Sequence, residues 1–298
     1  MSFRCGFVTI IGRPNVGKST LLNKLVGQKV SIVSPKPQTT RNAIVGILNG
    51  KNYQIVFTDT PGIHKPKNRL DEYMAESISK SIEGVDLILY VLDGTKRFFS
   101  EDIDDIVSYS NGNTPVVVLV SKVDDTTFEK LYPELAKLNN LQKIKDIIPF
   151  SSFSGKNIDL LKETILKYMP ESPAMYPQDV VTDSSQRFLC SEIIREKSLW
   201  LLQQEIPHGL AVQIESFKEE PNIVKISATI FCEKENHKKI IIGSAGQTLK
   251  KIGEESRIDI ERILGKKVFL ELWVKVKEHW RDSDILTNNL GYNKKELD

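Results

Sequence analysis

The octapeptide Gly12–Ser19 constrains the fold of this chain more than any other part of the sequence. It reads G-R-P-N-V-G-K-S and fits the pattern G-x-x-x-x-G-K-S without a mismatch. The strand-like run Phe7–Ile11 precedes it and a helical pattern over Ser19–Val26 follows it, which is the context of a phosphate-binding loop. An ordinary glycine turn before a helix is the alternative, but a full match in this context favours a nucleotide site. Lys18 would then reach the β- and γ-phosphates, and the Ser19 hydroxyl would ligate Mg²⁺.

Two later segments supply what a magnesium and γ-phosphate site needs. Residues Asp59–Gly62 read D-T-P-G and lie at the end of a predicted strand. Such a peptide is good turn chemistry by itself, but its position favours Asp59 as a water-mediated Mg²⁺ ligand and the Gly62 N–H as a γ-phosphate sensor. Thr40, with Thr39 as the fallback, lies where a switch segment belongs and would complete the magnesium shell. Loop threonines are usually only solvated, so this assignment rests on position.

Residues Ser121–Asp124 and Ser151–Phe153 predict which base is bound. Asp124 would accept hydrogen bonds from the N1–H and N2–H₂ groups of guanine, which adenine does not reproduce, and a carboxylate left unpaired is costly. The stem of Lys122 would cover the face of the base. The backbone N–H groups of Ser151–Phe153 would reach the guanine O6, although this last motif is weak by itself.

These assignments give a candidate set for a guanine-nucleotide site. The predicted catalytic residues are Asn15, Lys18, Thr40 and Gly62. The predicted magnesium ligands are Ser19, Thr40 and, through a water, Asp59. The predicted GTP contacts are Gly12, Arg13, Pro14, Asn15, Val16, Gly17, Lys18, Ser19, Thr20, Asp59, Thr60, Pro61, Gly62, Ser121, Lys122, Val123, Asp124, Ser151, Ser152 and Phe153.

The length and composition indicate an ordinary globular protein with more than one domain. A chain of 298 residues is expected to form two domains of roughly 100–200 residues each. No apolar run approaches the ~20 residues of a membrane span, and the N-terminus shows no secretory-signal pattern. The three cysteines are widely spaced, which predicts buried or free thiols and not a metal site or a disulfide framework. The net charge of +2 means that any nucleic-acid surface must be a local patch.

Up to the prolines that begin at Pro170, short β-branched runs alternate with amphipathic stretches, which predicts a mostly parallel sheet covered by helices. The predicted strands are Phe7–Ile11, Ile44–Leu48, Ile55–Phe57, Leu87–Leu92, Val116–Val120 and Ile147–Phe150. The predicted helices are Ser19–Val26, Leu70–Ile82, Asp102–Tyr109, Phe128–Leu138 and Asp159–Tyr168. Only Asn49–Asn52 joins the second and third strands, so these two should form an antiparallel hairpin.

The proline-rich segment Pro170–Pro177 cannot continue a helix and is interpreted as an interdomain linker. The expected domains are residues 1–172, a linker over 173–180, and residues 181–298. After the prolines the pattern becomes helix, strand, strand, helix, helix, strand. The corresponding segments are Gln186–Gln204, Leu210–Glu215, Val224–Cys232, the glycine-punctuated stretch Gly243–Leu264, and Val268–Val276.

With the nucleotide elements in this order, the first half of the chain resembles a translation-factor-type small GTPase. The sequences S-Q-R-F at Ser185–Phe188, S-E-I-I-R-E-K at Ser191–Lys197 and L-E-L-W-V-K-V-K at Leu270–Lys277 narrow the resemblance to the Era-like family of bacterial GTPases. The resemblance covers nearly the whole chain. It implies an α/β P-loop G domain, with a six-stranded mostly parallel sheet and helices on both faces, followed by an α+β type II KH domain. It also implies GTP or GDP with Mg²⁺ as cofactors, and binding of the 3′ end of 16S ribosomal RNA in small-subunit assembly.

The resemblance places the G-x-x-G loop of a KH domain at Gly243-Ser244-Ala245-Gly246, where the loop would hold the RNA backbone beside a groove for single-stranded bases. Two glycines at this spacing are a very weak signal without that pattern. The lysines that would neutralise phosphates are Lys238, Lys239, Lys250 and Lys251. A solvated charged face is the alternative for these lysines. Trp273 on the last strand is interpreted as a core residue and not as a stacking platform.

The sequence departs from the family pattern at two positions, and a third bears on hydrolysis. Ser121 stands where asparagine is usual, so a tether to the phosphate loop should be lost. The G-x-x-G loop has no basic residue between its glycines, which weakens one phosphate contact. Ile63 stands where a Ras-like enzyme has a water-orienting glutamine, so intrinsic hydrolysis should be slow. Related G domains use an asparagine at the Asn15 position to hold K⁺ against the phosphates, which makes K⁺ a candidate cofactor; a role in loop hydrogen bonding is the alternative.

Three functions fit these observations. The leading one is a GTP hydrolase whose nucleotide state controls RNA docking. The second is an RNA-binding assembly protein in which GTP turnover is incidental, and the third is a GTPase whose second domain binds protein or membrane. The resemblance implies a cytoplasmic protein that associates with 16S ribosomal RNA and the small subunit, with peripheral association with the inner membrane face. A monomer without a transmembrane segment is expected, although the sequence does not determine the oligomeric state.

Overall fold

The computed structural model describes residues 2–141, 143–203, 206–294 and 297. It divides into two compact units that interleave along the chain. Unit 1 comprises residues 1–31, 40–64 and 75–183, and unit 2 comprises residues 32–39, 65–74 and 184–298. The two short segments 32–39 and 65–74 therefore pack with the C-terminal part of the chain. The domain boundaries expected from the sequence, with a linker over 173–180, concern which parts of the chain fold independently, and they remain a prediction.

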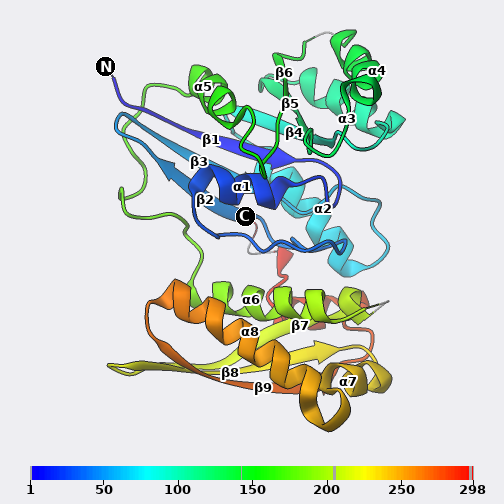
Figure 1. Ribbon diagram of the computed structural model, residues 1–298, viewed down its shortest axis with the longest axis vertical. Helices are drawn as coiled ribbons and strands as arrows, with labels where there is room; N and C mark the ends of the chain where they lie inside the picture. Colours follow the sequence, from blue (N-terminus) through cyan, green and yellow to red (C-terminus); the bar gives the residue numbers. More distant parts are fainter. Residues whose placement is uncertain (1, 142, 204–205, 295–296, 298) are drawn as a thin grey trace. The chain divides into compact units, whose positions relative to one another are not determined.

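Unit 1 contains a six-stranded sheet in the order β2-β3-β1-β4-β5-β6 (Figure 1). Its strands are β1 (Arg4–Ile11), β2 (Ile44–Asn49), β3 (Tyr53–Asp59), β4 (Leu87–Asp93), β5 (Val116–Ser121) and β6 (Asp146–Pro149). Its helices are α1 (Lys18–Val26), α2 (Arg69–Ile82), α3 (Ser100–Ser110), α4 (Phe128–Asn139) and α5 (Ile158–Tyr168), although α2 begins in unit 2. All six predicted strands and all five predicted helices of this part of the chain are confirmed.

The sheet is parallel except for one pair. Strands β2 and β3 pair antiparallel, which confirms the predicted hairpin, whereas the remaining pairs are parallel. Every residue of β4 and β5 is buried, as expected for central strands that are covered on both faces. Because the strands are parallel, the loops that follow β1, β3 and β5 all leave the same edge of the sheet, and these loops carry the predicted nucleotide residues.

The proline-rich segment lies against unit 1. Gln54, fully buried on β3, accepts hydrogen bonds from the backbone N–H groups of Met175 (2.8 Å) and Tyr176 (3.0 Å) and donates to the Tyr176 carbonyl (2.8 Å). Further on, the Val181 carbonyl accepts from Ile47 N of β2 at 2.9 Å. These backbone contacts keep the chain on unit 1 as far as residue 183.

Unit 2 is built on a three-stranded sheet in the order β7-β8-β9, with β7–β8 antiparallel and β8–β9 parallel. Its strands are β7 (Ala211–Glu219), β8 (Ile223–Cys232) and β9 (Lys267–Val276), and its helices are α6 (Gln186–Leu201), α7 (Glu235–Ile242), α8 (Gln247–Leu264) and α9 (Asp284–Asn289). Figure 1 shows α6 and α8 on one face of this sheet. Their apolar residues enclose one core with alternate residues of the strands.

The predicted order of elements in unit 2 is confirmed, although several element ends differ; β7, for example, continues to Glu219 and not to Glu215. The helix predicted to run to Gln204 ends at Leu201, and Gln204 lies outside the described residues. The glycine-punctuated stretch predicted around Gly243–Leu264 contains α8, whereas α7 (Glu235–Ile242) lies wholly before it and was not located from the sequence. Glu235–Lys239 is strongly polar, which hid this helix from an apolar pattern.

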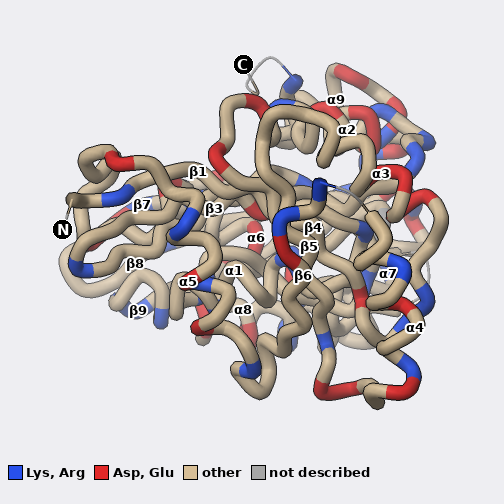
Figure 2. The backbone as a smooth tube through the Cα atoms, turned by 90° about the horizontal axis from the view of Figure 1, so that it is seen from above, with Lys and Arg blue, Asp and Glu red and all other residues tan. Residues whose placement is uncertain are grey.

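Three further features bear on the sequence predictions. Cys5, Cys190 and Cys232 are buried free thiols, as expected. Figure 2 shows lysine and arginine interspersed with aspartate and glutamate along the backbone, in keeping with the net charge of +2. Within the described part of the chain, no helix combines the length and apolar character that a bilayer crossing demands.

Candidate nucleotide site and nucleic-acid groove

The phosphate loop has a backbone that few residue types can adopt. Gly12 and Gly17 have positive φ values of 142° and 101°, and Asn15 has φ 64°. A Cβ atom on Gly12 would lie 2.4 Å from the Val91 carbonyl oxygen, so the close approach of the loop to β4 requires glycine. The loop then enters α1 at Lys18, which leaves the first N–H groups of that helix free for an anion.

The Lys18 side chain is folded into the phosphate loop. It is only 6% exposed, and its Nζ donates to the carbonyl oxygens of Gly12 (2.9 Å) and Arg13 (3.0 Å). Burial lowers the pKa of Lys18 to about 8, although the Asp59 carboxylate acts in the opposite direction. A phosphate at this place would supply the negative charge that the buried ammonium lacks.

Ser19, Thr40 and Asp59, the three predicted magnesium ligands, meet at one point. Ser19 Oγ lies 2.6 Å from Asp59 Oδ2 and 2.9 Å from Thr40 Oγ1. Burial raises the pKa of Asp59, against the lowering effect of Lys18 and of three hydroxyl groups. The other carboxylate oxygen, Asp59 Oδ1, is buried and has no hydrogen-bond partner among the described residues. Oxygen ligands with one free buried carboxylate oxygen fit Mg²⁺ or its water shell.

The fallback residue Thr39 has a different role from Thr40. Its hydroxyl lies 2.7 Å from Ser34 Oγ and donates to the Lys36 carbonyl at 2.6 Å. It is therefore engaged within its own loop, whereas the Thr40 hydroxyl faces Ser19. The geometry favours Thr40 at the magnesium position.

The segment Asp59–Gly62 places Gly62 against the phosphate loop. A Cβ atom on Gly62 would lie 2.6 Å from Pro14 N, so a larger residue would displace the loop. The next residue, Ile63, donates its N–H to the Gly12 carbonyl at 3.1 Å. Thr60 donates its hydroxyl to the Ile10 carbonyl at 2.8 Å, so this predicted GTP contact is occupied in holding the segment to β1.

The expected loss of the tether at Ser121 is wrong. Ser121 Oγ lies 2.6 Å from the Val16 carbonyl oxygen and 3.0 Å from the Leu92 carbonyl oxygen, with the side chain fully enclosed. A hydroxyl has one proton, which either carbonyl can accept. The phosphate loop comes close enough to β5 for this short side chain to replace the usual asparagine; a Cβ on Gly17 would be 3.8 Å from Ser121 Oγ.

Lys122 joins three parts of the site. Its Nζ donates to the Asn15 carbonyl (2.9 Å) and to Asp93 Oδ2 (2.7 Å). Burial alone would raise the pKa of Asp93, but hydrogen bonds from Lys122 and Thr95 hold it below its usual range. The Lys122 stem is thereby fixed beside the position predicted for the base. Asp93 was missed from the sequence, because nothing marks it except its place at the end of β4.

The predicted guanine-reading groups are accessible except at Ser151. Asp124 lies in an exposed turn, and no hydrogen bond joins its carboxylate to the rest of the described chain. Among the backbone donors, Ser151 gives its N–H to the Lys156 carbonyl at 3.1 Å, so it is not available to a base. The N–H groups of Ser152 and Phe153 remain the candidates for the guanine O6. Phe153 is 92% exposed, and the prediction concerns its backbone N–H group and not its ring.

Other residues that hold the site were also missed from the sequence. Ser31 donates to Asp59 Oδ2 at 2.9 Å, and Asn23 fixes Ser31 by accepting from its N–H (3.0 Å) and donating to its carbonyl (2.7 Å). Arg13, which was predicted to contact GTP, pairs with Asp102 on α3 at 2.7 Å, with Phe99 beneath the guanidinium. These contacts join residues that are distant in sequence, so no local motif could predict them.

The predicted G-x-x-G loop joins α7 to α8 with a conformation that requires its glycines. Gly243 has φ 76° and Gly246 has φ 78°, and a Cβ on Gly243 would lie 2.3 Å from Thr248 Oγ1. Between them, Ser244 and Ala245 are exposed, and Ala245 has φ 48°. The loop therefore presents a short stretch of backbone to solvent at the start of α8, as a backbone-binding loop must.

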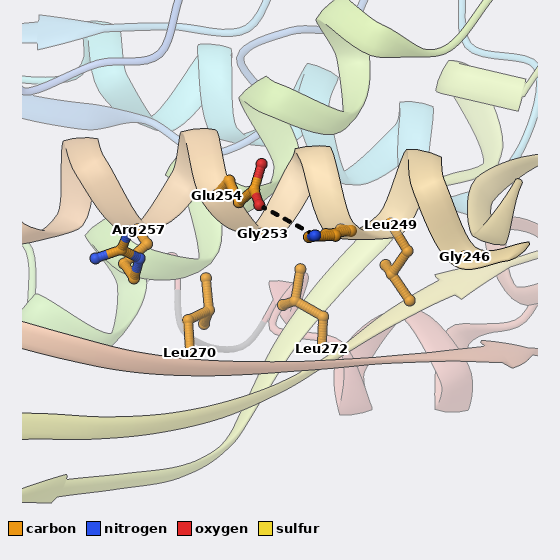
Figure 3. Close-up of a pocket in the computed structure, with 8 residues that line it drawn as sticks. Gly246, Leu249, Gly253, Glu254, Arg257, Leu270 and Leu272 are labelled. Carbon is orange, nitrogen blue, oxygen red and sulfur yellow. Dashed lines mark ion pairs between the residues drawn. The ribbon is translucent and has the colours of Figure 1, made fainter.

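A groove of about 470 Å³ continues from this loop between α8 and β9 (Figure 3). In Figure 3 the side chains of Leu270 and Leu272 rise from β9 towards α8 and form the apolar floor. The residues that line the groove are Gly246, Leu249, Lys250, Gly253, Glu254, Arg257, Leu270 and Leu272. An apolar floor bordered by cations fits bases below and phosphates above.

Of the residues predicted for RNA, Gly246 and Lys250 line this groove, whereas Lys238 and Lys239 lie on α7 and Lys251 lies on α8 outside the lining. Lys250 is 3.9 Å from Glu254, a long and exposed pair that a phosphate could displace. Arg257 was missed, because it stands well beyond the loop and joins the groove only through the helical repeat of α8.

The interpretation of Trp273 as a core residue is wrong. Trp273 is 55% exposed, and Phe269 on the same strand is 57% exposed. Side chains alternate along β9, so Leu270 and Leu272 face the helices while Phe269 and Trp273 face away. Because apolar residues lie on both faces of this strand, the sequence did not show which face the helices cover.

Comparison with known proteins agrees with this geometry. Residues 7–122 match the family described as "50S ribosome-binding GTPase", and residues 205–281 match "KH domain". GTPase Era of Clostridium botulinum (strain Okra) is 50% identical over 293 residues, with 98% of this chain and 99% of that protein covered. GTPase Era of Caldanaerobacter subterraneus subsp. tengcongensis is 47% identical over 294 residues, with the same two coverages.

Two solved structures are similar to the whole chain. An Era variant from Aquifex aeolicus bound to GDP·AlF₄⁻ has 41% identity and a TM-score of 0.93, and the alignment covers 98% of this chain and 100% of that one. Era in complex with MgGDPNP and nucleotides 1506–1542 of 16S ribosomal RNA has 41% identity and a TM-score of 0.93, with coverages of 98% and 99%. The predicted fold class, a P-loop G domain followed by a KH domain, is confirmed.

Proposed function

The chain belongs to the Era family of GTPases, and from this premise we propose that it is a switch whose guanine nucleotide controls binding of the 3′ end of 16S ribosomal RNA during small-subunit assembly. The observation that carries the proposal is the likeness, over 98% of the chain, to an Era structure that holds both MgGDPNP and nucleotides of that RNA. The same likeness supports GTP and GDP with Mg²⁺ as the cofactors.

In this proposal the phosphate loop binds the nucleotide before any chemistry occurs. The free N–H groups at the start of α1 and the Lys18 ammonium bind the phosphates. Lys122 covers the base, and Asp124 selects guanine. A bound Mg²⁺ would neutralise charge on the β- and γ-phosphates. Ser19, Thr40 and Asp59 would hold it, and the free Asp59 Oδ1 supports this assignment.

Hydrolysis is proposed to be slow without help. Ile63 packs against the apolar cluster that includes Ile11 and Tyr90, and an apolar side chain cannot orient the attacking water. A K⁺ ion beside Asn15 is one source of help, since its charge would oppose that of the phosphates in the transition state. Turnover measured in K⁺ and in Na⁺ at equal ionic strength tests this, and equal rates would remove K⁺ and Asn15 from the mechanism.

RNA binding is proposed to use the groove between α8 and β9. The Gly243–Gly246 backbone would contact phosphates, Lys250 and Arg257 would neutralise them, and Leu270 and Leu272 would contact bases. Single-stranded RNA is the expected ligand, because its unstacked bases can enter such a groove, whereas those of an A-form duplex cannot.

The experiment that tests the proposal is crosslinking of the purified protein to the 3′-terminal segment of 16S ribosomal RNA in GTP- and GDP-loaded states. We expect the crosslinks to map to α7, α8 and β9 and their yield to depend on the nucleotide. Equal yields in both states would favour the alternative in which GTP turnover is incidental. No crosslinks in either state would instead point to a second domain that binds protein or membrane.

The proposal extends to the cellular setting. A monomer in the cytoplasm, with peripheral association with the inner membrane face, agrees with a ribosome-assembly role and with the family. The separately folding parts are proposed to be residues 1–172 and 181–298. Gradient sedimentation of a cell lysate with and without EDTA tests the ribosomal association, because EDTA dissociates the subunits and should shift the protein with them.

A further inference from the structure

One face of α6 contacts the backbone of residues 33–39, which belong to the same compact unit. The contacts come from Arg195, Glu196 and Trp200, and Glu192 on the same side of the helix pairs with Arg195. Their spacing of three, four and eight residues places them along one side of a helix. Neither the G domain motifs nor the KH groove explains this face.

Arg195 is the centre of these contacts. It is 1% exposed, and its guanidinium is paired with Glu192 at 2.7 Å (Nε to Oε1) and 2.5 Å (Nη2 to Oε2). The same Nη2 donates to the Thr39 carbonyl oxygen, and Nη1 lies 3.5 Å from the Gln38 carbonyl oxygen. A buried, bidentate pair fixes the guanidinium in one orientation, so its remaining donors define where the Thr39 carbonyl must lie.

The other end of the segment is held at Val33. Glu196 Oε1 accepts from the Val33 N–H at 2.9 Å, and Trp200 Nε1 donates to the Val33 carbonyl at 2.9 Å. Thus α6 contacts the main chain at both ends of 33–39. These hydrogen bonds are made to the backbone of the segment and not to its side chains.

Between these ends, residues of the segment hydrogen-bond one another. The Thr39 hydroxyl is bonded to Ser34 and Lys36, and Gln38 has a left-handed backbone with φ 58°. A non-glycine residue keeps such a conformation only where its surroundings impose it. Thr39 ends this segment and is followed directly by Thr40, whose hydroxyl lies 2.9 Å from Ser19 Oγ.

We propose that Arg195 and Glu196 are positioning residues for GTP: by fixing the main chain of 33–39, they hold the Thr40 hydroxyl beside Ser19, where it completes the magnesium site. This inference rests on the proposed nucleotide switch and deepens it. GDP lacks the γ-phosphate whose magnesium Thr40 would ligate. The α6 contacts should therefore contribute to Mg·GTP binding and little to GDP binding, which links a KH-domain helix to the identity of the nucleotide.

The test measures the affinities of the full-length protein for Mg·GDP and for a non-hydrolysable Mg·GTP analogue. The double variant E192Q/R195Q removes both buried charges together, so that neither is left unpaired. We expect the GTP-analogue affinity to fall about tenfold, as loss of a charge-assisted hydrogen bond predicts, and the GDP affinity to change less than about twofold. Amide exchange at residues 33–40 in the GTP-analogue state should become faster.

The matched control is R187Q on the same helix. Arg187 also donates from its guanidinium to a backbone carbonyl, that of Ile214 at 2.9 Å, but it does not touch 33–39. It should leave both affinities unchanged. If the double variant fails to fold, W200F replaces it: Trp200 is 55% exposed, and loss of its indole N–H should lower only the GTP-analogue affinity, about two- to fivefold.

Equal losses for GDP and the GTP analogue would show that α6 only supports the fold and would overturn the inference, as would unchanged values for both. The proposed function fails separately. Its failure appears in the wild-type protein, as RNA crosslinking that ignores the nucleotide. If RNA crosslinking depends on GTP in the wild-type protein and depends on it equally in the E192Q/R195Q variant, the proposed function stands and only the positioning role of Arg195 is refuted.

Discussion

Lys18 and Asp59 in the nucleotide site are 6% and 0% exposed, whereas the Lys250 and Arg257 side chains beside the RNA groove are 77% and 43% exposed. The nucleotide residues hydrogen-bond one another through buried or partly buried contacts of 2.6–3.0 Å. The groove cations instead form exposed ion pairs with glutamates of the same helix, Lys250 with Glu254 at 3.9 Å and Arg257 with Glu261 at 3.1 Å. Buried polar contacts are strong and mutually dependent, while exposed charges are screened and nearly additive. Single substitutions should therefore act sharply at the first site and gradually at the second.

Lys18→Ala should give the largest effect. The variant loses an ammonium that burial has already positioned for the phosphates. Affinity for GTP and GDP should therefore fall at least ~100-fold, so that the protein no longer binds nucleotide at physiological concentrations. Titration of a fluorescent guanine nucleotide measures this. Lys24→Ala, which removes an exposed lysine from the same helix, should leave the affinity unchanged. Near-normal binding by Lys18→Ala would contradict the sharp response expected of a buried site.

Asp124→Asn should give the next largest effect. It should change which base the protein prefers as well as weaken GTP binding. An amide cannot accept both hydrogen bonds from guanine N1–H and N2–H₂, so GTP affinity should fall about 100-fold, while xanthosine triphosphate affinity rises. Competition between the two nucleotides measures the preference. Asp125→Asn provides the control, because it alters a neighbouring exposed carboxylate. Retained selectivity for GTP would assign guanine recognition to another residue.

In the groove, the double substitution S244D/A245D should lower RNA affinity about tenfold and leave nucleotide affinity unchanged. Two carboxylates beside the RNA backbone would repel phosphates, and the loss should diminish as salt is added. S244N/A245N is the matched control, since asparagine has nearly the same shape and tolerates the left-handed backbone at Ala245. Normal RNA binding by the aspartate variant would remove the loop from the interface.

The same contrast explains how far the sequence could predict each site. The phosphate loop, the Asp59 segment and Asp124 are short continuous motifs, and the strand and helix periods around them were clear. Arg257, Asp93 and Ser31 reach their sites only through folding, so no local pattern marks them. The sequence also misjudged two environments. Ser121 keeps a tether because the loop approaches it, and Trp273 is exposed because its strand is covered on the opposite face.

Ser121→Ala should give the smallest effect and tests the comparison most closely. It removes one hydroxyl whose proton is shared by the Val16 and Leu92 carbonyls, which leaves a buried acceptor without its donor. That costs about 1 kcal/mol, so guanine-nucleotide affinity should fall about fivefold, with RNA affinity in the absence of nucleotide unchanged. Ser110→Ala removes a buried hydroxyl that has no hydrogen-bond partner among the described residues, and it should be nearly neutral. If the two variants bind nucleotide equally well, the tether is only a close contact, and the sharp response of the nucleotide site is confined to its charged residues.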